Sequence, residues 1–246
     1  MRNIKLEIEY DGTNYCGWQV QTHQKHKPTI QDTIEKVLRK ILQEKINLIG
    51  SGRTDAGVHA KAQVANFKTS SGINLNKLRW ALNGLMPDEI AVSKIEEVPL
   101  DFHSRFDAKS KVYRYTILNR GFPSAMLRNT AYFYHYPLNV VLMQKQARPL
   151  LGRHNFKSFQ ASDNKERDAT RTIKRIKITE ERDLIYIDIE ADGFLRNMVR
   201  NIVGTLIEIG RGNPIDMKKL ISLKDRRKAG PTAPAKGLCL MKLNYK

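Results

Sequence analysis

The order of two kinds of periodic segment at the start of the chain restricts the fold more than any other feature. Apolar and charged residues alternate over residues 4–10, and a period of two is typical of a strand with one buried face. Thr29 stands directly before apolar residues at helical spacing that extend to Leu42. Because threonine is a favoured N-cap, we expect an amphipathic helix that Thr29 opens and that packs on a sheet.

The following segments continue this pattern. Strands are expected at 46–49, 62–67 and 90–98. A second helix is expected between Asn74, which is a favoured N-cap, and the turn at 87–88, where a proline ends it. The resulting order is strand, helix, strand, strand, helix, strand. It predicts an α/β fold on the ferredoxin-like plan, which many RNA-binding domains use.

A similar order of segments follows in the second half of the chain. Residues 99–111 contain few apolar residues and end in a basic tail, so we expect a domain boundary there, between an N-terminal domain of residues 1–104 and a C-terminal domain of residues 105–246. The polar segment 152–171 is expected to be a long surface loop of the kind that carries function. The remaining expected elements are strands at 112–118, 130–136, 172–179, 184–190 and 238–243 and helices at 139–151, 195–209 and 216–224.

The stretch Gly50–Ala60 is the first candidate for chemistry. It holds the carboxylate of Asp55 between two glycines and close to Arg53. Glycines permit backbone conformations that are closed to other residues, so Asp55 can be presented at the tip of a loop. The alternative is structural, because an aspartate in a glycine-rich turn often bonds only its own backbone.

Tyr113 and a pair of arginines are further candidates. Tyr113 shares one face of a predicted strand with Tyr115. A strand tyrosine usually packs in the core, but one at the start of a strand beside a domain boundary is well placed to stack on an unstacked base. Arg196 and Arg200 fall on a polar stripe of the helix expected at 195–209. Either both arginines are solvated, or an anion lies along the stripe, such as a phosphate or the Asp55 carboxylate.

The charge of the chain restricts its partners. There are 43 lysine and arginine residues against 25 aspartate and glutamate residues, which gives a formal net charge of +18. A surplus of this size attracts polyanions, among which nucleic acid is the commonest. A membrane surface is the competing partner, but no strongly amphipathic basic helix is evident at either terminus. We therefore expect a nucleic-acid partner and no membrane.

The lengths of the apolar runs and the spacing of the cysteines argue against several classes of protein. No run approaches the ~18 apolar residues of a membrane span, and the first residues lack the apolar core of a secretory signal. We expect a cytoplasmic protein. Cys16 and Cys239 have no Cys-x-x-Cys spacing, so neither a zinc site nor a disulfide framework is indicated.

The Gly50–Ala60 stretch resembles the central motif of the pseudouridine synthases, and most closely that of the tRNA pseudouridine synthase A family. The resemblance covers nearly the whole chain, with two small departures: Asn155 stands where Asp is more usual, and Ser104 where Ala is. The further matching motifs are Tyr10–Gln19, Phe106–Tyr115, Met198–Gly204 and Gly230–Leu240.

The resemblance implies a fold, a substrate and site residues. The fold is an α/β (α+β) enzyme of two ferredoxin- or RRM-like domains that share an extended, mainly antiparallel sheet, with a basic active-site cleft between them. Such enzymes are homodimers without metal or organic cofactor. They bind the anticodon stem-loop of tRNA and isomerise uridines 38, 39 and 40 to pseudouridine. Asp55 matches the catalytic aspartate and Tyr113 the base-stacking tyrosine. Arg53 and Arg200 match arginines that contact the flipped nucleotide or pair with the aspartate.

The chemistry of the reaction is compatible with these roles. Uridine must lose its N1–C1′ bond, turn and rejoin through C5. An ionised carboxylate can attack C1′ or abstract a proton to give a glycal, and the sequence leaves both mechanisms open. A nearby arginine favours the ionised carboxylate. Stacking on a tyrosine contributes ~1–3 kcal/mol toward the cost of unstacking the base.

Two other functions remain as alternatives. A non-catalytic protein that binds structured RNA would use the same basic residues and aromatics. A carboxylate in a phosphate-binding groove lowers the affinity for RNA, so the presence of Asp55 is better explained by a chemical role. A metal-dependent nuclease is a weaker alternative, because no cluster of carboxylates or histidines with ligand spacing surrounds Asp55.

Overall fold

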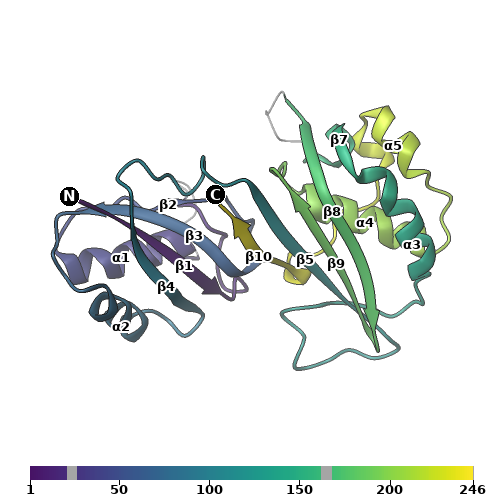
Figure 1. Cartoon of the computed structure of the whole chain (residues 1–246). Helices are drawn as coiled ribbons and strands as arrows, with labels where there is room; N and C mark the ends of the chain where they lie inside the picture. Colours follow the sequence, from purple (N-terminus) through teal and green to yellow (C-terminus); the bar gives the residue numbers. More distant parts are fainter. Residues whose placement is uncertain (21–26, 162–167, 246) are drawn as a thin grey trace. The chain divides into compact units, whose positions relative to one another are not determined.

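The structure is a computed structural model that describes residues 1–20, 27–161 and 168–245. The chain divides into two compact units (Figure 1). Unit 1 consists of Met1–Lys109 together with Leu240–Lys246, and unit 2 consists of Ser110–Cys239. The return of the last residues to unit 1 is a feature that no local pattern in the sequence indicates, because strand pairing between the two ends of a chain is set by tertiary contacts.

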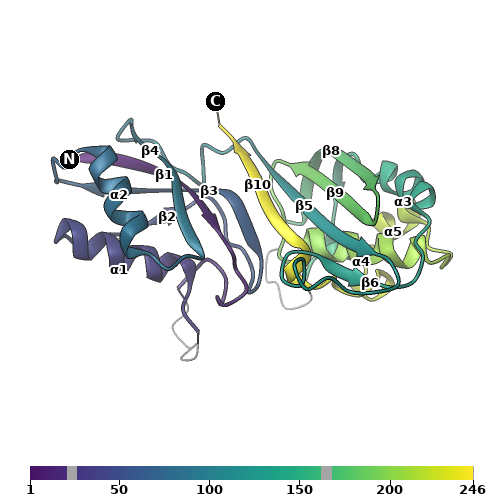
Figure 2. The same ribbon diagram turned by 90° about the horizontal axis from the view of Figure 1, so that it is seen from below.

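Unit 1 is a sheet with two helices. The sheet order is β4-β1-β3-β10, with β2 paired to β3, and β1 is antiparallel to both of its neighbours. The helices α1 and α2 pack against each other on one face of this sheet (Figure 2). The elements are β1 (Arg2–Tyr10), α1 (Ile30–Leu42), β2 (Ile49–Gly50), β3 (His59–Thr69), α2 (Leu75–Leu85), β4 (Ile90–Val98) and, mostly in unit 1, β10 (Leu238–Asn244).

Local signals account for most of unit 1. The alternation in β1 buries Ile4, Leu6 and Ile8 completely. Both expected N-caps are present: the Thr29 side chain accepts a hydrogen bond from the Asp32 N–H, and Asn74 caps α2. The strand expected at 46–49 is wrong in extent, because β2 consists of Ile49–Gly50 alone. The apolar residues before it are buried in an irregular segment instead.

Among its described residues, unit 2 contains paired strands and three α-helices. Its order is β5-β9-β8-β7 with antiparallel pairing, and β6 lies parallel to β5. Helix α3 packs against α4 and β8. The elements are β5 (Ser110–Asn119), β6 (Tyr132–Tyr134), α3 (Val140–Ala147), η1 (Arg148–Leu150), β7 (Gly152–Asn155), η2 (Lys157–Phe159), β8 (Thr170–Glu181), β9 (Leu184–Ala191), α4 (Met198–Gly210), α5 (Met217–Leu223), η3 (Arg226–Lys228) and η4 (Ala235–Gly237). The predicted α/β class is confirmed.

The segment 152–171 corrects a prediction. Its polar composition predicts a surface loop, but it contains β7 and the 3-10 turn η2. Phe156 and Phe159 are completely buried, whereas Lys157 between them is exposed. Two aromatic side chains suffice to anchor a polar segment to the core. Residues 162–167 of the predicted loop lie outside the described residues.

Candidate functional site

Asp55 lies in the loop between β2 and β3, where the sequence predicts a turn. Asp55 is half-buried and Arg53 is exposed. Gly57 has a φ of +76°, a conformation that favours glycine, and the Val58 N–H donates to the Asp55 carbonyl at 3.2 Å. Gly52 does not have a positive φ. The backbone conformation of the loop therefore favours a glycine after the aspartate. Gly52, before the aspartate, is not required by a positive φ.

The motif at residues 10–18 forms the support of this loop. The hydroxyls of Tyr10 and Thr54 are hydrogen-bonded at 2.8 Å, and the Trp18 N–H donates to the Thr54 carbonyl at 3.1 Å. Tyr10 and Trp18 are each 2% exposed. These two aromatic residues thus hold Thr54, the residue next to Asp55, in place. Their burial favours a structural role over direct contact with a substrate.

Two glycines let the supporting segment approach the loop backbone to backbone. A Cβ on Gly12 would lie 2.1 Å from the Val58 carbonyl oxygen. A Cβ on Gly17, whose φ is +87°, would lie 2.4 Å from the Thr54 carbonyl oxygen. Real Cβ atoms essentially never approach another atom this closely. The conformation of the Asp55 loop therefore depends on glycine at two positions outside the loop.

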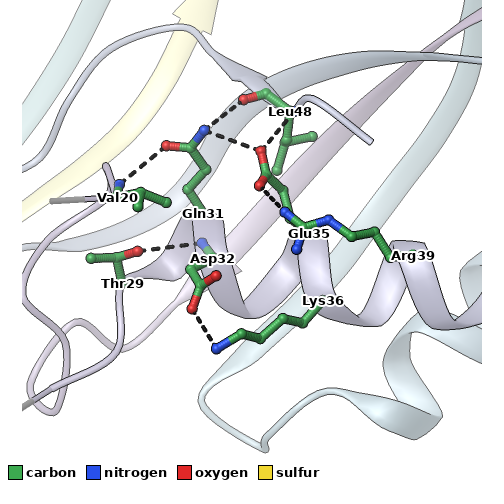
Figure 3. A network of polar contacts seen from close by, with 8 residues as sticks. All are labelled: Val20, Thr29, Gln31, Asp32, Glu35, Lys36, Arg39 and Leu48. Atoms are coloured by element: carbon green, nitrogen blue, oxygen red, sulfur yellow. Dashed lines mark hydrogen bonds and ion pairs between the residues drawn. The ribbon is translucent and has the colours of Figure 1, made fainter. Parts of the chain in front are cut away.

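Helix α1 holds the chain that leads into the loop (Figure 3). Gln31 Nε2 donates to the Leu48 carbonyl at 3.0 Å, and Glu35 Oε1 accepts from the Leu48 N–H at 2.9 Å. Gln31 also accepts from the Val20 N–H at 3.3 Å. The carboxylate of Glu35, which is 7% exposed, is paired with Arg39 at 2.6 Å. One helix thereby fixes both the end of the supporting segment and the entry to the Asp55 loop.

Ser104 and Asn155, the departures from the family pattern, have defined structural roles. The Ser104 hydroxyl is buried and donates to the Ile49 carbonyl at 2.5 Å, next to the start of the Asp55 loop. Asn155 Oδ1 accepts from the Lys157 N–H at 3.1 Å. Both residues bond to the backbone of their own unit.

His59 and Asp11 form an ion-pair contact at the end of the loop. His59 Nδ1 lies 3.1 Å from Asp11 Oδ1, a contact that is an ion pair when the imidazole is protonated, and a deprotonated Nδ1 instead accepts from the Gly12 N–H at 3.2 Å. Burial raises the pKa of Asp11, but hydrogen bonds from Thr13 and the charge of His59 outweigh it, so this pKa lies below its ordinary value. The turn that supports Val58 is thus tied to the first residue of β3.

Tyr113 lies on β5 in unit 2 and is 8% exposed. Its ring contacts Phe194 edge-on, with 5.2 Å between centroids and an interplanar angle of 90°. Tyr115 and Ile117, on the same face, are completely buried. The expected sharing of one face is confirmed. Since so little of the Tyr113 ring is exposed, stacking on a base requires that a neighbouring group move aside.

Arg200 lies in the first turn of α4 and donates hydrogen bonds within unit 2. Its Nε donates to the Ala233 carbonyl at 2.7 Å and its Nη1 to Asn197 Oδ1 at 3.1 Å. The side chain is half-buried, so part of its donor capacity is used by the protein. Arg196 precedes the helix, which begins at Met198, because Asn197 adopts a left-handed conformation with φ 60°. The predicted helical stripe with two arginines is therefore wrong.

Gly204 and Thr205, which follow Arg200 on α4, pack against the segment before η4. A Cβ on Gly204 would lie 1.7 Å from the Pro231 carbonyl oxygen. The Gly230 N–H donates to Thr205 Oγ1 at 3.0 Å, and the Ala233 N–H donates to the Arg200 carbonyl at 3.1 Å. Helix α4 and residues 230–233 thus form one closely packed body.

Asn201, Thr232 and Arg226 form a polar cluster beside helix α4 that is not evident from the sequence. The completely buried Asn201 donates to the Phe159 carbonyl at 2.7 Å, and its Oδ1 accepts from Thr232 Oγ1 at 2.6 Å and Arg226 Nη2 at 3.0 Å. A basic run such as that around Arg226 usually forms a solvated face. The one local sign of a different role is Asp225. Its side chain caps the turn η3, which begins at Arg226.

Asp55 and Arg53 are brought into one loop of unit 1, and Tyr113 and Arg200 into unit 2. Within residues 1–20, 27–161 and 168–245, no group of three or more His, Cys, Asp or Glu side chains is placed to hold a metal ion. None of the helices in these ranges is long and apolar enough to cross a membrane.

Comparisons with known proteins identify the family. A sequence model of the family described as tRNA pseudouridine synthase matches residues 7–107 and 147–246. The tRNA pseudouridine synthase A of Clostridium acetobutylicum is 49% identical over 247 residues, and that of Acetivibrio thermocellus is 47% identical; both alignments cover 100% of each chain. The chain belongs to the tRNA pseudouridine synthase family, as its motifs predict.

Solved structures show more distant similarity. A chain in the crystal structure of a Cbf5-Nop10-Gar1 complex aligns with 97% of this chain at 13% identity and a TM-score of 0.36, and the match spans 58% of that chain. A chain in the structure of an H/ACA RNP bound to a substrate RNA containing 2'-deoxyuridine aligns with 83% of this chain at 12% identity and a TM-score of 0.35. In that case the match spans 44% of the other chain.

Proposed function

We propose that the protein isomerises uridine to pseudouridine in tRNA, at positions 38, 39 and 40 of the anticodon stem-loop. The observation that carries the proposal is the full-length similarity to enzymes named tRNA pseudouridine synthase A. It favours catalysis over the alternative of a non-catalytic RNA-binding protein. The formal charge of +18 is suited to a polyanionic substrate.

Asp55 is the catalytic carboxylate in this proposal. Its loop is held on both sides, by residues 10–18 and by β3, so the backbone that carries the carboxylate is fixed before substrate binds. Positioning of this kind lowers the barrier because the reacting group needs no further ordering in the transition state. The carboxylate either attacks C1′ of the ribose as a nucleophile or abstracts a proton as a base.

Tyr113, Arg53 and Arg200 bind the target nucleotide. The exposed guanidinium of Arg53 lies two positions from Asp55 in the same loop, where it favours the ionised carboxylate or contacts a phosphate. Tyr113 stacks on the uracil after its neighbours move aside. Arg200, whose Nε donates to the Ala233 carbonyl, contacts the flipped nucleotide or pairs with Asp55.

The assembly and location follow from the same family. The protein acts as a homodimer in the cytoplasm and needs no metal or organic cofactor. Addition of EDTA to the assay tests the last point, because a metal-dependent activity would be lost and the proposed one is retained.

The decisive experiment compares Asp55→Asn with Asp88→Asn. Asp88 is exposed in the turn after α2, so its replacement removes the same charge from the same unit. Release of tritium from tRNA labelled at C5 of uridine measures the reaction, because C5 loses its hydrogen when the new glycosidic bond forms. We expect Asp55→Asn to abolish release and to retain tRNA affinity within about tenfold, roughly 1.4 kcal/mol. Asp88→Asn should behave as wild type.

Two results would overturn the assignment. If Asp55→Asn retains more than a few per cent of the wild-type rate, Asp55 is not the catalytic group. If tRNAs whose only labelled uridine lies at position 38, 39 or 40 release no tritium with wild-type protein, the proposed substrate positions are wrong.

A further inference from the structure

Arg226 is half-buried, whereas the other basic residues of the run 224–228 are exposed. Its guanidinium donates a hydrogen bond to Asn201 of α4. We propose that Arg226 is a positioning residue for Arg200 in uridine isomerisation. The inference rests on the proposed function of the protein. It adds a residue from a basic run, a kind of segment that usually forms a solvated face.

The guanidinium of Arg226 joins two parts of unit 2. Its Nη1 donates to the Gly230 carbonyl at 2.9 Å, and its Nη2 donates to Thr232 Oγ1 at 3.1 Å and to Asn201 Oδ1 at 3.0 Å. Asn201 belongs to α4, whereas the other two residues belong to the segment that packs on it. A planar guanidinium holds its five donors in a fixed fork that suits such divergent acceptors, whereas a lysine has three rotatable donors on a single nitrogen.

The hydrogen bonds continue from this segment to Arg200. Ala233, which directly follows Thr232, donates its N–H to the Arg200 carbonyl at 3.1 Å and accepts from Arg200 Nε at 2.7 Å. The backbone of residues 230–231 lies against Gly204 and Thr205 so closely that a methyl group would not fit. A displacement of this segment is therefore transmitted to the Arg200 side chain.

The surroundings of Arg226 favour geometry over ion pairing as its role. Each hydrogen-bond acceptor of its guanidinium within the described residues is an uncharged oxygen. Burial lowers the pKa of Arg226 from its ordinary value, since a partly desolvated cation without a carboxylate is held at a cost. Such a cation persists where its fixed set of donors organises the neighbouring backbone.

Arg227 provides a matched control. It lies in the same 3-10 turn, but its side chain is 88% exposed and pairs with Asp225 at 2.9 Å. Replacing either arginine with lysine keeps the charge, so the long-range attraction to tRNA is unchanged. The variants Arg226→Lys and Arg227→Lys therefore differ in the contacts to α4 and not in electrostatics.

The test measures the single-turnover rate of isomerisation and the tRNA dissociation constant separately. We expect Arg226→Lys to lower the rate by about tenfold or more, because a displacement of the order of 1 Å at a reacting centre has a large effect. Its dissociation constant should stay within about threefold of wild type. Arg227→Lys should change neither. Equal rates for the two lysine variants would overturn the proposal.

A double-mutant cycle tests whether Arg226 acts through Arg200. If it does, Arg226→Lys in an Arg200→Lys background should lower the rate by less than about twofold, because the coupled group is already altered. Multiplicative effects of the two substitutions would show that Arg226 acts by another route, and the proposal would be wrong.

Two further measurements keep the test decisive. If Arg226→Lys does not fold, Thr232→Val removes one acceptor of the guanidinium without changing the charge, and it should lower the rate while leaving tRNA affinity intact. The exchange of the Arg200 Nε–H with solvent, followed by NMR, should accelerate in Arg226→Lys and not in Arg227→Lys. This exchange is independent of turnover, so an inactive wild type would refute the proposed function while unchanged exchange would refute the positioning role.

Discussion

The Tyr113 hydroxyl and the Tyr113 ring can be tested apart. Because the ring packs edge-on against Phe194, phenylalanine at this position keeps the packing and the surface on which a base stacks. We expect Tyr113→Phe to bind tRNA within about twofold of wild type and to turn over more slowly, if the hydroxyl helps to remove the C5 proton. Binding by fluorescence anisotropy and tritium release measure the two effects.

Tyr113→Ala is the complementary variant. It removes a nearly buried ring, so it should harm both properties and reduce the free energy of unfolding by about 3 kcal/mol. Normal turnover in Tyr113→Phe would exclude the proton-transfer role and leave stacking as the function of this residue.

Asp11 makes a pH-dependent contribution to the support of the Asp55 loop. Its pKa is lower in the folded protein than the ordinary value of 3.8, so the folded state binds fewer protons through this group. The charged form therefore stabilises the fold above pH ~4, and the contribution is lost as the pH falls through the folded pKa. The side chain is 40% exposed, which makes the effect modest.

Melting temperatures at pH 6 and pH 3 test this contribution. Wild type should melt higher than Asp11→Asn at pH 6, because Asn keeps an oxygen for Thr13 and loses the charge that faces His59. The difference should shrink at pH 3, because this pH lies below the ordinary pKa of 3.8 and the stabilisation is lost as the pH falls toward the lowered pKa of the folded state. An identical difference at both pH values would contradict the assignment.

At the scale of elements, the close approach between the 10–18 segment and the Asp55 loop should be sensitive to a single methyl group. We expect Gly12→Ala to reduce the free energy of unfolding by about 1–3 kcal/mol, as is typical of overpacking. It should also reduce turnover, because Val58 lies in the loop that carries Asp55 and its carbonyl must move.

Gly84→Ala is the matched control for this prediction. Gly84 is exposed near the end of α2, and a Cβ there meets no atom within 4 Å. Alanine has the higher helix propensity, so this variant should gain about 0.5–1 kcal/mol and keep full activity. Denaturant unfolding distinguishes the two outcomes, and equal stability changes in the two variants would refute the close approach.

The elements that the sequence predicts well are those whose signals are local. Thr29 and Asn74 cap their helices with hydrogen bonds to residues two or three positions away, so composition and spacing suffice. The limits of β2 and the burial of Phe156 depend on residues distant in sequence. The start of α4 is a further example, because the left-handed conformation of Asn197 makes the helix begin at Met198, about one turn later than the predicted start at residue 195.

The candidate site divides in the same way. Asp55 is recognisable because its glycines, its arginine and its loop occupy one short stretch. The support of that loop by Gly12 and Gly17 is visible only in the structure, since neither glycine neighbours Asp55 in sequence. Arg226 is the most distant case: its role depends on Asn201, from another element, and a run of basic residues gives no sign of it.

For the molecule as a whole, the net charge of +18 leads to a quantitative prediction. Lysines and arginines that contact phosphates displace condensed counterions, so log affinity for tRNA should fall linearly with log salt. The slope is about −0.7 per phosphate for single strands and −0.9 for duplex DNA; a folded stem-loop is neither, so the two values bracket the expected slope. Contacts to roughly four to eight phosphates give a slope between about −3 and −7.

Two lysine variants connect this slope to particular residues. Lys111 lies at the start of β5, two residues before Tyr113, and its replacement by alanine should flatten the slope by about one unit and weaken all RNAs alike. Lys36 is an exposed residue of α1 that pairs with Asp32 at 2.7 Å, so Lys36→Ala should leave the slope unchanged. Fluorescence anisotropy over a series of salt concentrations gives all three slopes. A wild-type slope near zero would mean that the surplus charge lies away from the binding surface, and the argument from charge to nucleic acid would fail even if the protein isomerises uridine.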